Sequence, residues 1–242
     1  MDIDAQCREI LTTGFCVLKK LLPEDVVQAC ARSFAPLLQA HVARSDAAPN
    51  RGPARHFVPL PFEAPFADPI LYENNAILAI AERILGADMA IGTYATDTPL
   101  EGSVYQEVHS DISPLFPELD YIPPPYVIAV NFPFVDVGPE NGPFEVARGT
   151  HLLPREAALQ RLESGEIALE PLCLEIGDVL IRDPRCLHRG SPNRTPKARP
   201  VAVISLVRAW YRFVYIPSIP KIEYEQLSER ARQLFRFIPV GD

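Results

Sequence analysis

Proline accounts for 26 of the 242 residues, and this frequency constrains the fold more than any other feature of the sequence. A proline has no backbone N–H group, so it disrupts helix interiors and is excluded from central strands of a sheet. We therefore expect short regular elements joined by many loops. Residues 44–69 hold six prolines without a clear hydrophobic period, which predicts an extended loop region there.

Helices are predicted at both ends of the chain. Helices are expected at residues 1–13, 23–43, 74–85 and 221–236, and the second of these shows the three- and four-residue apolar spacing of a helix with one buried face. Pro23 suits a first helical turn, and Glu24 and Asp25 complement the helix dipole. Gly86 is a natural terminator for the third helix. A short strand is expected at residues 14–18.

From residue 87 onward the pattern changes to short strands separated by turn residues. Turn signals include Glu140-Asn141-Gly142 and Gly177-Asp178. The strands are expected at residues 88–96, 103–109, 126–135, 143–147, 170–174, 178–182, 186–189 and 201–214. Several short strands at this spacing indicate a mainly β barrel or sandwich with helices packed outside it.

Length and charge exclude several classes of protein. A chain of 242 residues fits one large domain or two small ones, and we expect a single domain over residues 1–242. The net charge of −8 and the lack of a Lys/Arg cluster argue against a nucleic-acid partner. Five widely spaced cysteines favour reduced thiols. An acidic N-terminus and the absence of a long apolar stretch predict a cytoplasmic protein without a membrane partner.

The residues that carry chemistry begin with His109-Ser110-Asp111. Residues two apart on a strand point to the same face, so the imidazole and the carboxylate can reach one metal ion. His188 is the natural third ligand, and two histidines with one carboxylate form the usual non-haem Fe(II) oxygenase site. A His-x-Asp sequence arises by chance in roughly a quarter of chains of this composition, so the motif alone is weak.

The surrounding motifs make the assignment stronger. The chain resembles the phytanoyl-CoA dioxygenase family of Fe(II)- and 2-oxoglutarate-dependent oxygenases. The resemblance covers residues 13 to about 212, and Val108 departs from it because family members often have Trp there. Its motifs are, in order, Thr13-Gly14-Phe15-Cys16-Val17-Leu18, Gln106 with His109 and Asp111, Glu140-Asn141-Gly142-Pro143-Phe144, Arg148-Gly149-Thr150-His151, Gly177-Asp178-Val179-Leu180, and Arg199 eleven residues after His188.

The resemblance implies a double-stranded β-helix, or jelly roll, with flanking N-terminal and C-terminal helices. It implies Fe(II) held by His109, Asp111 and His188, and 2-oxoglutarate as co-substrate. An Arg that opens an apolar strand can pair with a buried carboxylate, so Arg199 is the expected clasp. Arg194 is its main competitor and Arg208 a weaker one. Gln106 and Asn131 are further candidates for co-substrate binding.

The expected reaction is hydroxylation of a small-molecule metabolite, such as a natural-product intermediate, with release of succinate and CO2. Related halogenases lack the carboxylate, so Asp111 favours hydroxylation over halogenation. Desaturation or ring formation on the same fold stays open, as do a metal-binding cupin-like protein without 2-oxoglutarate and an inactive scaffold. A homodimer is also compatible with the sequence. We expect the proline- and aromatic-rich residues 113–126 to form a mobile lid over the iron.

Overall fold

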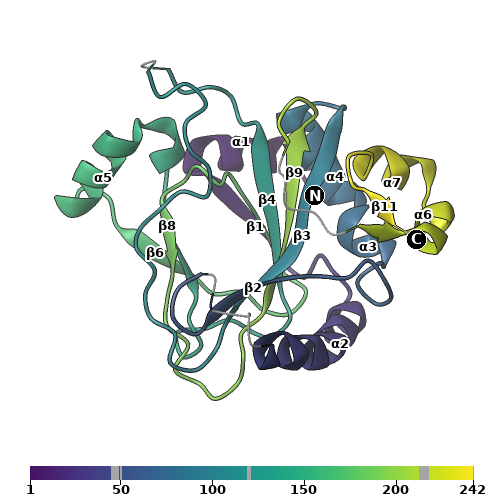
Figure 1. The fold of residues 1–242 in the computed structure, drawn as a ribbon. Coiled ribbons are helices and arrows are strands. Elements are labelled where there is room, and N and C mark those ends of the chain that lie inside the picture. Colours follow the sequence, from purple (N-terminus) through teal and green to yellow (C-terminus); the bar gives the residue numbers. More distant parts are fainter. Residues whose placement is uncertain (45–48, 50, 119–120, 213–217, 242) are drawn as a thin grey trace.

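The computed structural model describes residues 1–44, 49, 51–118, 121–212 and 218–241 (Figure 1). The helices are α1 (Ile3–Thr13), α2 (Glu24–Ala43), α3 (Pro69–Tyr72), α4 (Asn75–Leu85), α5 (Arg155–Glu163), α6 (Lys221–Gln226) and α7 (Glu229–Leu234), and a 3-10 turn, η1, spans Thr150–Leu152. The strands are β1 (Phe15–Leu18), β2 (Arg55–Pro59), β3 (Met89–Pro99), β4 (Val127–Pro133), β5 (Phe144–Ala147), β6 (Leu169–Leu172), β7 (Val179–Arg182), β8 (His188–Gly190), β9 (Val201–Arg208), β10 (Ile219–Pro220) and β11 (Val240–Gly241).

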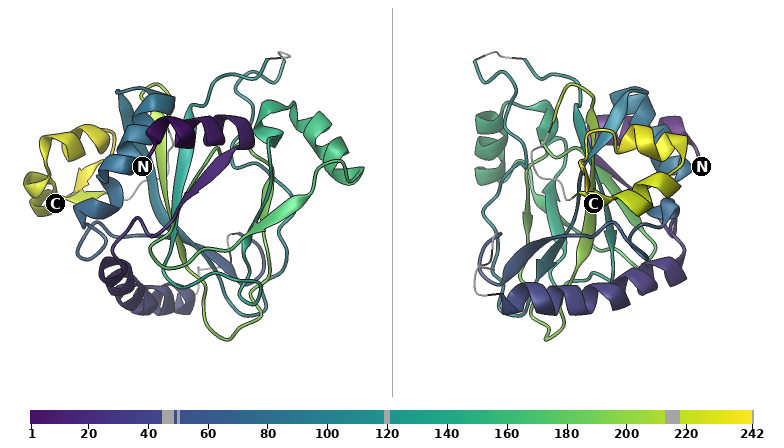
Figure 2. Two further views of the ribbon diagram at one scale, coloured as in Figure 1. Left: turned by 180° about the vertical axis from the view of Figure 1, so that it is seen from behind. Right: turned by 45° about the vertical axis from the view of Figure 1, so that its right-hand side comes forward.

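Two antiparallel sheets form the centre of the molecule. The larger sheet has the strand order β1-β7-β4-β9-β3-β2, and the smaller has the order β6-β5-β8. The strands β10 and β11 pair separately near the C-terminus. Figure 2 shows the smaller sheet and α5 on one side of the larger sheet, with α4, α6 and α7 on the other. The predicted jelly roll with flanking helices is confirmed.

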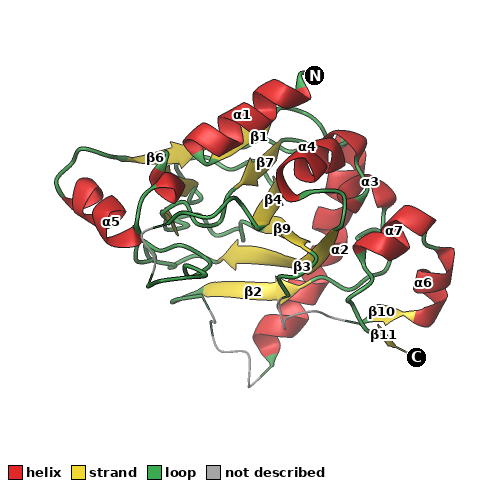
Figure 3. Cartoon of the chain, turned by 90° about the horizontal axis from the view of Figure 1, so that it is seen from above, coloured by secondary structure: helices red, strands yellow, loops and turns green. Residues whose placement is uncertain are grey.

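The larger sheet has two mainly apolar faces, and successive side chains of each strand point to one face and then to the other. In β4, Ile128, Val130 and Phe132 belong to the main core under the helices, while Val127, Ala129 and Asn131 line a cavity between the sheets. The neighbouring strands β7 and β9 follow the same rule, because successive side chains of a strand point to opposite faces. The helix side is closed by α1, α2 and α4 (Figure 3). This alternation is what gives the cavity its lining.

Local signals set the ends of the N-terminal helices. The Asp2 side chain accepts a hydrogen bond from the Ala5 N–H at the start of α1, and Asn74 caps α4 in the same way. Gly14 ends α1 with a positive φ of 95°, and an added Cβ there would lie 2.6 Å from Sγ of Cys186. Glycine at this position lets the chain turn directly into β1.

The structure corrects several expected elements. Residues 103–109 form no regular strand; only Gln106 and His109 donate backbone hydrogen bonds to β8, so this segment is an irregular edge. The expected loop at 44–69 contains β2, which pairs with β3 at the sheet margin, where proline is tolerated. The helix expected at 221–236 is split into α6 and α7 at Leu227, and Ser228 caps α7.

Three further differences concern helix lengths and strand ends. The helix α2 is 20 residues long and contains Pro36 in its interior. Proline therefore limits helix length here less than expected. Helix α5 was not expected because its single buried residue, Ala158, leaves almost no apolar period. The strand expected at 201–214 ends at Arg208, and residues 213 and 214 lie outside the described part of the chain.

No helix among the described residues combines the length and the apolar character that a membrane crossing needs.

Burial of His151 predicts a pH-dependent stability. Its side chain is buried against α1, where Nε2 hydrogen-bonds with the Leu11 carbonyl at 3.2 Å, and desolvation lowers its pKa below the ordinary 6.5. A lowered pKa means that the unfolded chain takes up the proton first as the pH falls. The free energy of unfolding of the metal-free protein should therefore decrease as the pH falls below about 6.5.

Urea unfolding of the metal-free protein between pH 5 and 8 checks this expectation. The variant His151→Gln keeps a hydrogen-bond donor but does not titrate, so its stability should decrease less over this range. A residual slope is expected because burial also lowers the pKa of His56 and of His109. Identical slopes for the variant and the parent protein would show that His151 does not contribute.

Candidate metal centre

Two histidines are brought together by one pair of backbone hydrogen bonds. The N–H of His109 donates to the carbonyl of His188, and the N–H of His188 donates to the carbonyl of His109, both at 2.9 Å. This isolated antiparallel bridge joins the irregular edge segment to β8. Because the two residues lie directly opposite each other, their rings stand side by side with centroids 4.4 Å apart.

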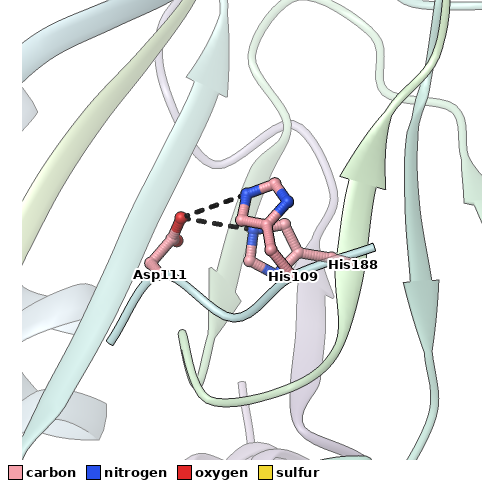
Figure 4. Close-up of side chains that lie close together, drawn as sticks. All are labelled: His109, Asp111 and His188. Carbon is pink, nitrogen blue, oxygen red and sulfur yellow. Dashed lines mark ion pairs between the residues drawn. The ribbon is translucent and has the colours of Figure 1, made fainter. Parts of the chain in front are cut away.

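Asp111 completes a three-residue cluster. Figure 4 shows its carboxylate pointing toward both imidazole rings. Its Oδ1 atom lies 3.3 Å from Nε2 of His188 and 3.7 Å from Nε2 of His109. One donor atom from each residue lies within 4.8 Å of the others. Such a group of two nitrogen donors and one oxygen donor can surround a single divalent ion.

The histidine tautomers suit this role. Each Nδ1 lies 2.8 Å from a backbone carbonyl, that of Glu107 for His109 and that of Cys186 for His188. A ring that donates from Nδ1 leaves the Nε2 lone pair free for a metal ion. Burial and the neighbouring His188 also lower the pKa of His109, which keeps its ring neutral near pH 7. The chemistry of the three side chains therefore fits Fe(II).

Asp111 has a cationic partner that the sequence did not suggest. Nη2 of Arg182 donates to Oδ2 of Asp111 at 2.7 Å, and Nε of Arg182 donates to Oδ1 of Asn131 at 3.1 Å. Desolvation would raise the pKa of the Asp111 carboxyl, but its contacts with Arg182 and His188 hold that pKa well below its usual range. The carboxylate is therefore ionised at neutral pH.

A cavity of about 490 Å³ opens beside these residues, between the two sheets. Its walls are mainly apolar, and polar side chains cluster at the metal residues and around Arg199. The apolar side chains in its lining are Phe57, Ile112, Val127, Ala129, Val137, Phe144, Leu172, Leu174, Leu180, Val201 and Val203. A largely apolar pocket with a few convergent polar groups is typical of a small-molecule site.

Arg199 lines this cavity and is only 3% exposed. Its nearest acidic partner is Asp97, with Nη2 and Oδ2 separated by 3.6 Å, beyond the usual hydrogen-bond range. Nε of Arg199 is buried and has no hydrogen-bond partner among the described residues. Asp97 instead accepts a hydrogen bond of 2.8 Å from the buried Arg55. The Arg199 guanidinium thus keeps unused donors next to the cavity.

The other two candidate residues also reach the cavity wall, but their amides already have protein partners. The Gln106 side chain accepts a hydrogen bond from the Gly190 N–H and donates one to the Arg51 carbonyl. Asn131 accepts from Arg182 and donates to the Ala202 carbonyl. Both amides therefore hold the wall of the pocket in place.

The alternatives to Arg199 lie elsewhere. Arg194 is exposed, and its side chain is not part of the cavity lining. Arg208 donates hydrogen bonds to the carbonyls of Pro125 and Ile84, which ties β9 to its neighbours. Of the three arginines considered from the sequence, the structure places only Arg199 at the cavity.

Sequence reasoning missed Arg182, Arg55 and Asp97. A signal existed for Arg182, because a charged residue ending the buried strand 178–182 shares a face with Leu180, which lines the cavity. Arg55 carried no such signal, since its segment was expected to be a loop. A Cβ on Gly190 would lie 2.5 Å from Nη1 of Arg55, so the glycine is required for this packing.

The described residues of the segment 113–126 lie at a different cavity from the one beside the metal residues. None of its described residues lines the central cavity; several line a second cavity of about 350 Å³, which includes residues of η1 and α5. The Pro123 carbonyl accepts a hydrogen bond from Arg185, and the Tyr126 hydroxyl donates to the Ser113 carbonyl. These bonds hold the segment near both of its ends, and its closure over the iron when ligands bind stays a prediction.

The fold is shared with solved structures of low sequence identity. EvdMO1 matches with a TM-score of 0.64 and 19% identity over 86% of this chain, which corresponds to 50% of that chain. The epimerase SnoN was crystallised with Fe3+, alpha ketoglutarate and nogalamycin RO. It matches with a TM-score of 0.66 and 20% sequence identity, over 88% of this chain and 87% of the SnoN chain. HygX from Streptomyces hygroscopicus, with nickel and 2-oxoglutarate bound, matches with a TM-score of 0.63 and 21% sequence identity, over 89% of this chain and 90% of the HygX chain.

A protein-family model identifies the relationship directly. The model for phytanoyl-CoA dioxygenase matches residues 11–201, which include the predicted ligands and Arg199. This match covers most of the chain and, except for most of β9, the strands of both sheets that enclose the cavity. The chain therefore belongs to the phytanoyl-CoA dioxygenase family of non-haem Fe(II)- and 2-oxoglutarate-dependent oxygenases.

Proposed function

We propose that this enzyme hydroxylates a small-molecule metabolite in the cavity between its sheets, with conversion of 2-oxoglutarate to succinate and CO2. The observation that carries the proposal is the placement of His109, Asp111 and His188 beside the same cavity that Arg199 lines. A metal site and a buried cation facing one pocket provide both attachment points for a co-substrate that has a chelating end and a carboxylate end.

His109, Asp111 and His188 would hold Fe(II). Two imidazoles and a carboxylate leave the remaining positions of an octahedral ion open for co-substrate and dioxygen. When bound, the metal and the co-substrate together supply the oxidising power that no amino-acid side chain has. The contribution of the protein is to fix the three donors, to align the reactants and to keep water away behind apolar walls.

Arg199 would bind the carboxylate of 2-oxoglutarate that lies farther from the metal. Its guanidinium is buried, and Nε has no partner among the residues that the structure describes. A bidentate pair with a carboxylate would satisfy donors that are otherwise costly to leave unused. We assign Gln106 and Asn131 to the pocket wall, where they orient Gly190 and Arg182 around the co-substrate.

The substrate would be a metabolite of modest size with an apolar surface. The apolar walls of the cavity favour such a molecule, and the cavity volume must also hold the co-substrate. SnoN was crystallised with nogalamycin RO, and it shares the fold. This likeness supports a natural-product intermediate as the substrate class to examine first.

Coupled turnover is the direct test. The purified protein with Fe(II) and 2-oxoglutarate should release succinate slowly, and a true substrate should raise that rate about tenfold or more, because a bound substrate aligns the reactants. Succinate is measured by mass spectrometry across a panel of polycyclic and small polar metabolites. A product heavier by one oxygen indicates hydroxylation, and a product lighter by two hydrogens indicates desaturation or ring formation.

The control is the same assay without Fe(II) or with a chelator, which should remove all succinate release. If the metal-loaded protein binds no 2-oxoglutarate and forms no succinate, the proposal fails. The structure would then fit a metal-binding protein that shares the fold but uses no co-substrate.

A further inference from the structure

Arg182 is an arginine held beside the proposed metal site by three different contacts. It is 7% exposed and ends β7, with Nη2 on Oδ2 of Asp111 and Nε on Oδ1 of Asn131. Its guanidinium carbon also lies 4.9 Å from the centroid of the Phe144 ring. Asn131 is fixed in turn by its bond to the Ala202 carbonyl. The guanidinium therefore has little freedom to move away from Asp111.

The two oxygens of Asp111 have different partners as a result. Oδ1 faces the Nε2 atoms of both histidines, whereas Oδ2 accepts the hydrogen bond from Arg182. A carboxylate can bind a metal ion through one oxygen or through both. Engagement of Oδ2 by a buried guanidinium leaves one oxygen for the ion.

The protein keeps Arg182 in place even though one of its nitrogens is unsatisfied. Nη1 is buried and has no hydrogen-bond partner within the described part of the chain. An unsatisfied buried donor usually costs about 1–3 kcal/mol, more when the group is charged. Such a group calls for an explanation beyond folding.

We propose that Arg182 is a positioning residue that restricts Asp111 to ligation through one oxygen and thereby reserves metal positions for 2-oxoglutarate. This inference rests on the proposed function. A second effect follows from charge: Asp111 contributes one negative charge beside the ion, and Arg182 offsets it. The positive charge of the bound metal is then left to attract the doubly negative co-substrate.

This role differs from plain structural support in what it predicts for metal affinity. Loss of Arg182 frees the second oxygen of Asp111 and removes a positive charge next to the ion. Both changes favour metal binding and oppose binding of the dianion. A residue that merely stabilises the fold would instead weaken both when removed.

The variants Arg182→Met and Arg182→Lys separate these cases. Methionine removes the charge and the hydrogen bonds, whereas lysine keeps a cation that can still donate to Asp111. The matched control is Arg185→Met. Arg185 lies three residues away and pairs with buried Asp183 through bonds of 2.6 and 2.9 Å, but it does not line the central cavity.

Isothermal titration calorimetry measures Mn(II) binding to the metal-free protein, and then 2-oxoglutarate binding to the Mn(II)-loaded protein. For Arg182→Met we expect Mn(II) affinity to be retained or increased and 2-oxoglutarate affinity to fall roughly tenfold. Lysine should recover most of that loss, and Arg185→Met should leave both affinities within about twofold of the parent values.

Two results would overturn the proposal: unchanged 2-oxoglutarate affinity in Arg182→Met, or a parallel loss of metal and co-substrate binding. If Arg182→Met does not fold, Arg182→Gln takes its place, because glutamine also removes the charge, and a 2-oxoglutarate affinity equal to that of the parent protein would then overturn the proposal. Failure of the proposed function looks different, since the parent protein itself would then bind Mn(II) without binding 2-oxoglutarate.

Discussion

The single substitutions His109→Ala, Asp111→Ala and His188→Ala should each lower succinate formation by at least about a hundredfold. Each change removes one of three protein ligands, so Fe(II) affinity falls together with the geometry that chemistry requires. Succinate release with saturating Fe(II) and 2-oxoglutarate measures the effect on activity, and Mn(II) calorimetry measures the effect on metal binding. Near-normal activity in any of the three variants would disprove the triad assignment.

Stability must be followed in the same variants. The side chain of His109 is 32% exposed, so its removal should leave the thermal unfolding of the metal-free protein nearly unchanged. Removal of Asp111 should lower stability, because it leaves the buried Arg182 without its carboxylate partner. His188 is 3% exposed, and its truncation leaves a small void that should lower stability modestly. His151→Gln is the matched control, because it alters a buried histidine outside the cluster. Its metal affinity and turnover should stay close to the parent values.

Arg199→Ala should raise the concentration of 2-oxoglutarate needed for half-saturation roughly thirtyfold or more. Truncating one member of a buried charged pair costs about 2 kcal/mol or more, since the remaining carboxylate is left without a partner. Burial lowers the pKa of Arg199 to about 10, which still leaves the guanidinium charged at neutral pH. Anaerobic titration of 2-oxoglutarate into the Fe(II)-loaded variant provides the measurement.

Arg194→Ala is the control for Arg199. Arg194 is exposed and belongs to the same connection between β8 and β9, so its removal should change the requirement by no more than about twofold. Arg199→Lys should fall between the two, because a lysine keeps the charge but not the fork of two donors. A larger effect at Arg194 than at Arg199 would reassign the carboxylate site to Arg194.

The metal cluster could be predicted from the sequence because its residues lie within short, recognisable motifs. His109 and Asp111 are two residues apart, and His188 belongs to a second motif of the family. The order of strands that the resemblance implies was enough to predict that the three residues lie together. The faces of β4 and β9 were also predictable, since a period of two assigns alternate residues to the core and to the cavity. The number and spacing of the short strands predicted a barrel or sandwich, and the resemblance to the family implied the jelly roll.

What escaped prediction depends on contacts between distant segments. Arg182 meets Asp111 across 71 residues, and Arg55 meets Asp97 across 42, so no local pattern could show that these charges are paired. The edge segment 103–109 has strand-like composition, yet it joins β8 at only two places. Hydrogen bonds from Arg185 to the Pro123 carbonyl and from Tyr126 to the Ser113 carbonyl also join residues that propensity alone does not pair.

The reciprocal backbone bonds between His109 and His188 have a consequence for selectivity among metal ions. They set the separation of the two imidazoles by main-chain geometry, before any ion arrives, and the carbonyls behind each Nδ1 set the ring orientations. The entropy of arranging two of the three donors is therefore lost during folding and not again on binding. Asp111 is restrained from its own side, by the bond from its N–H to the Pro184 carbonyl and by Arg182 on Oδ2, so little carboxylate rotation is left to accommodate ions of different radius.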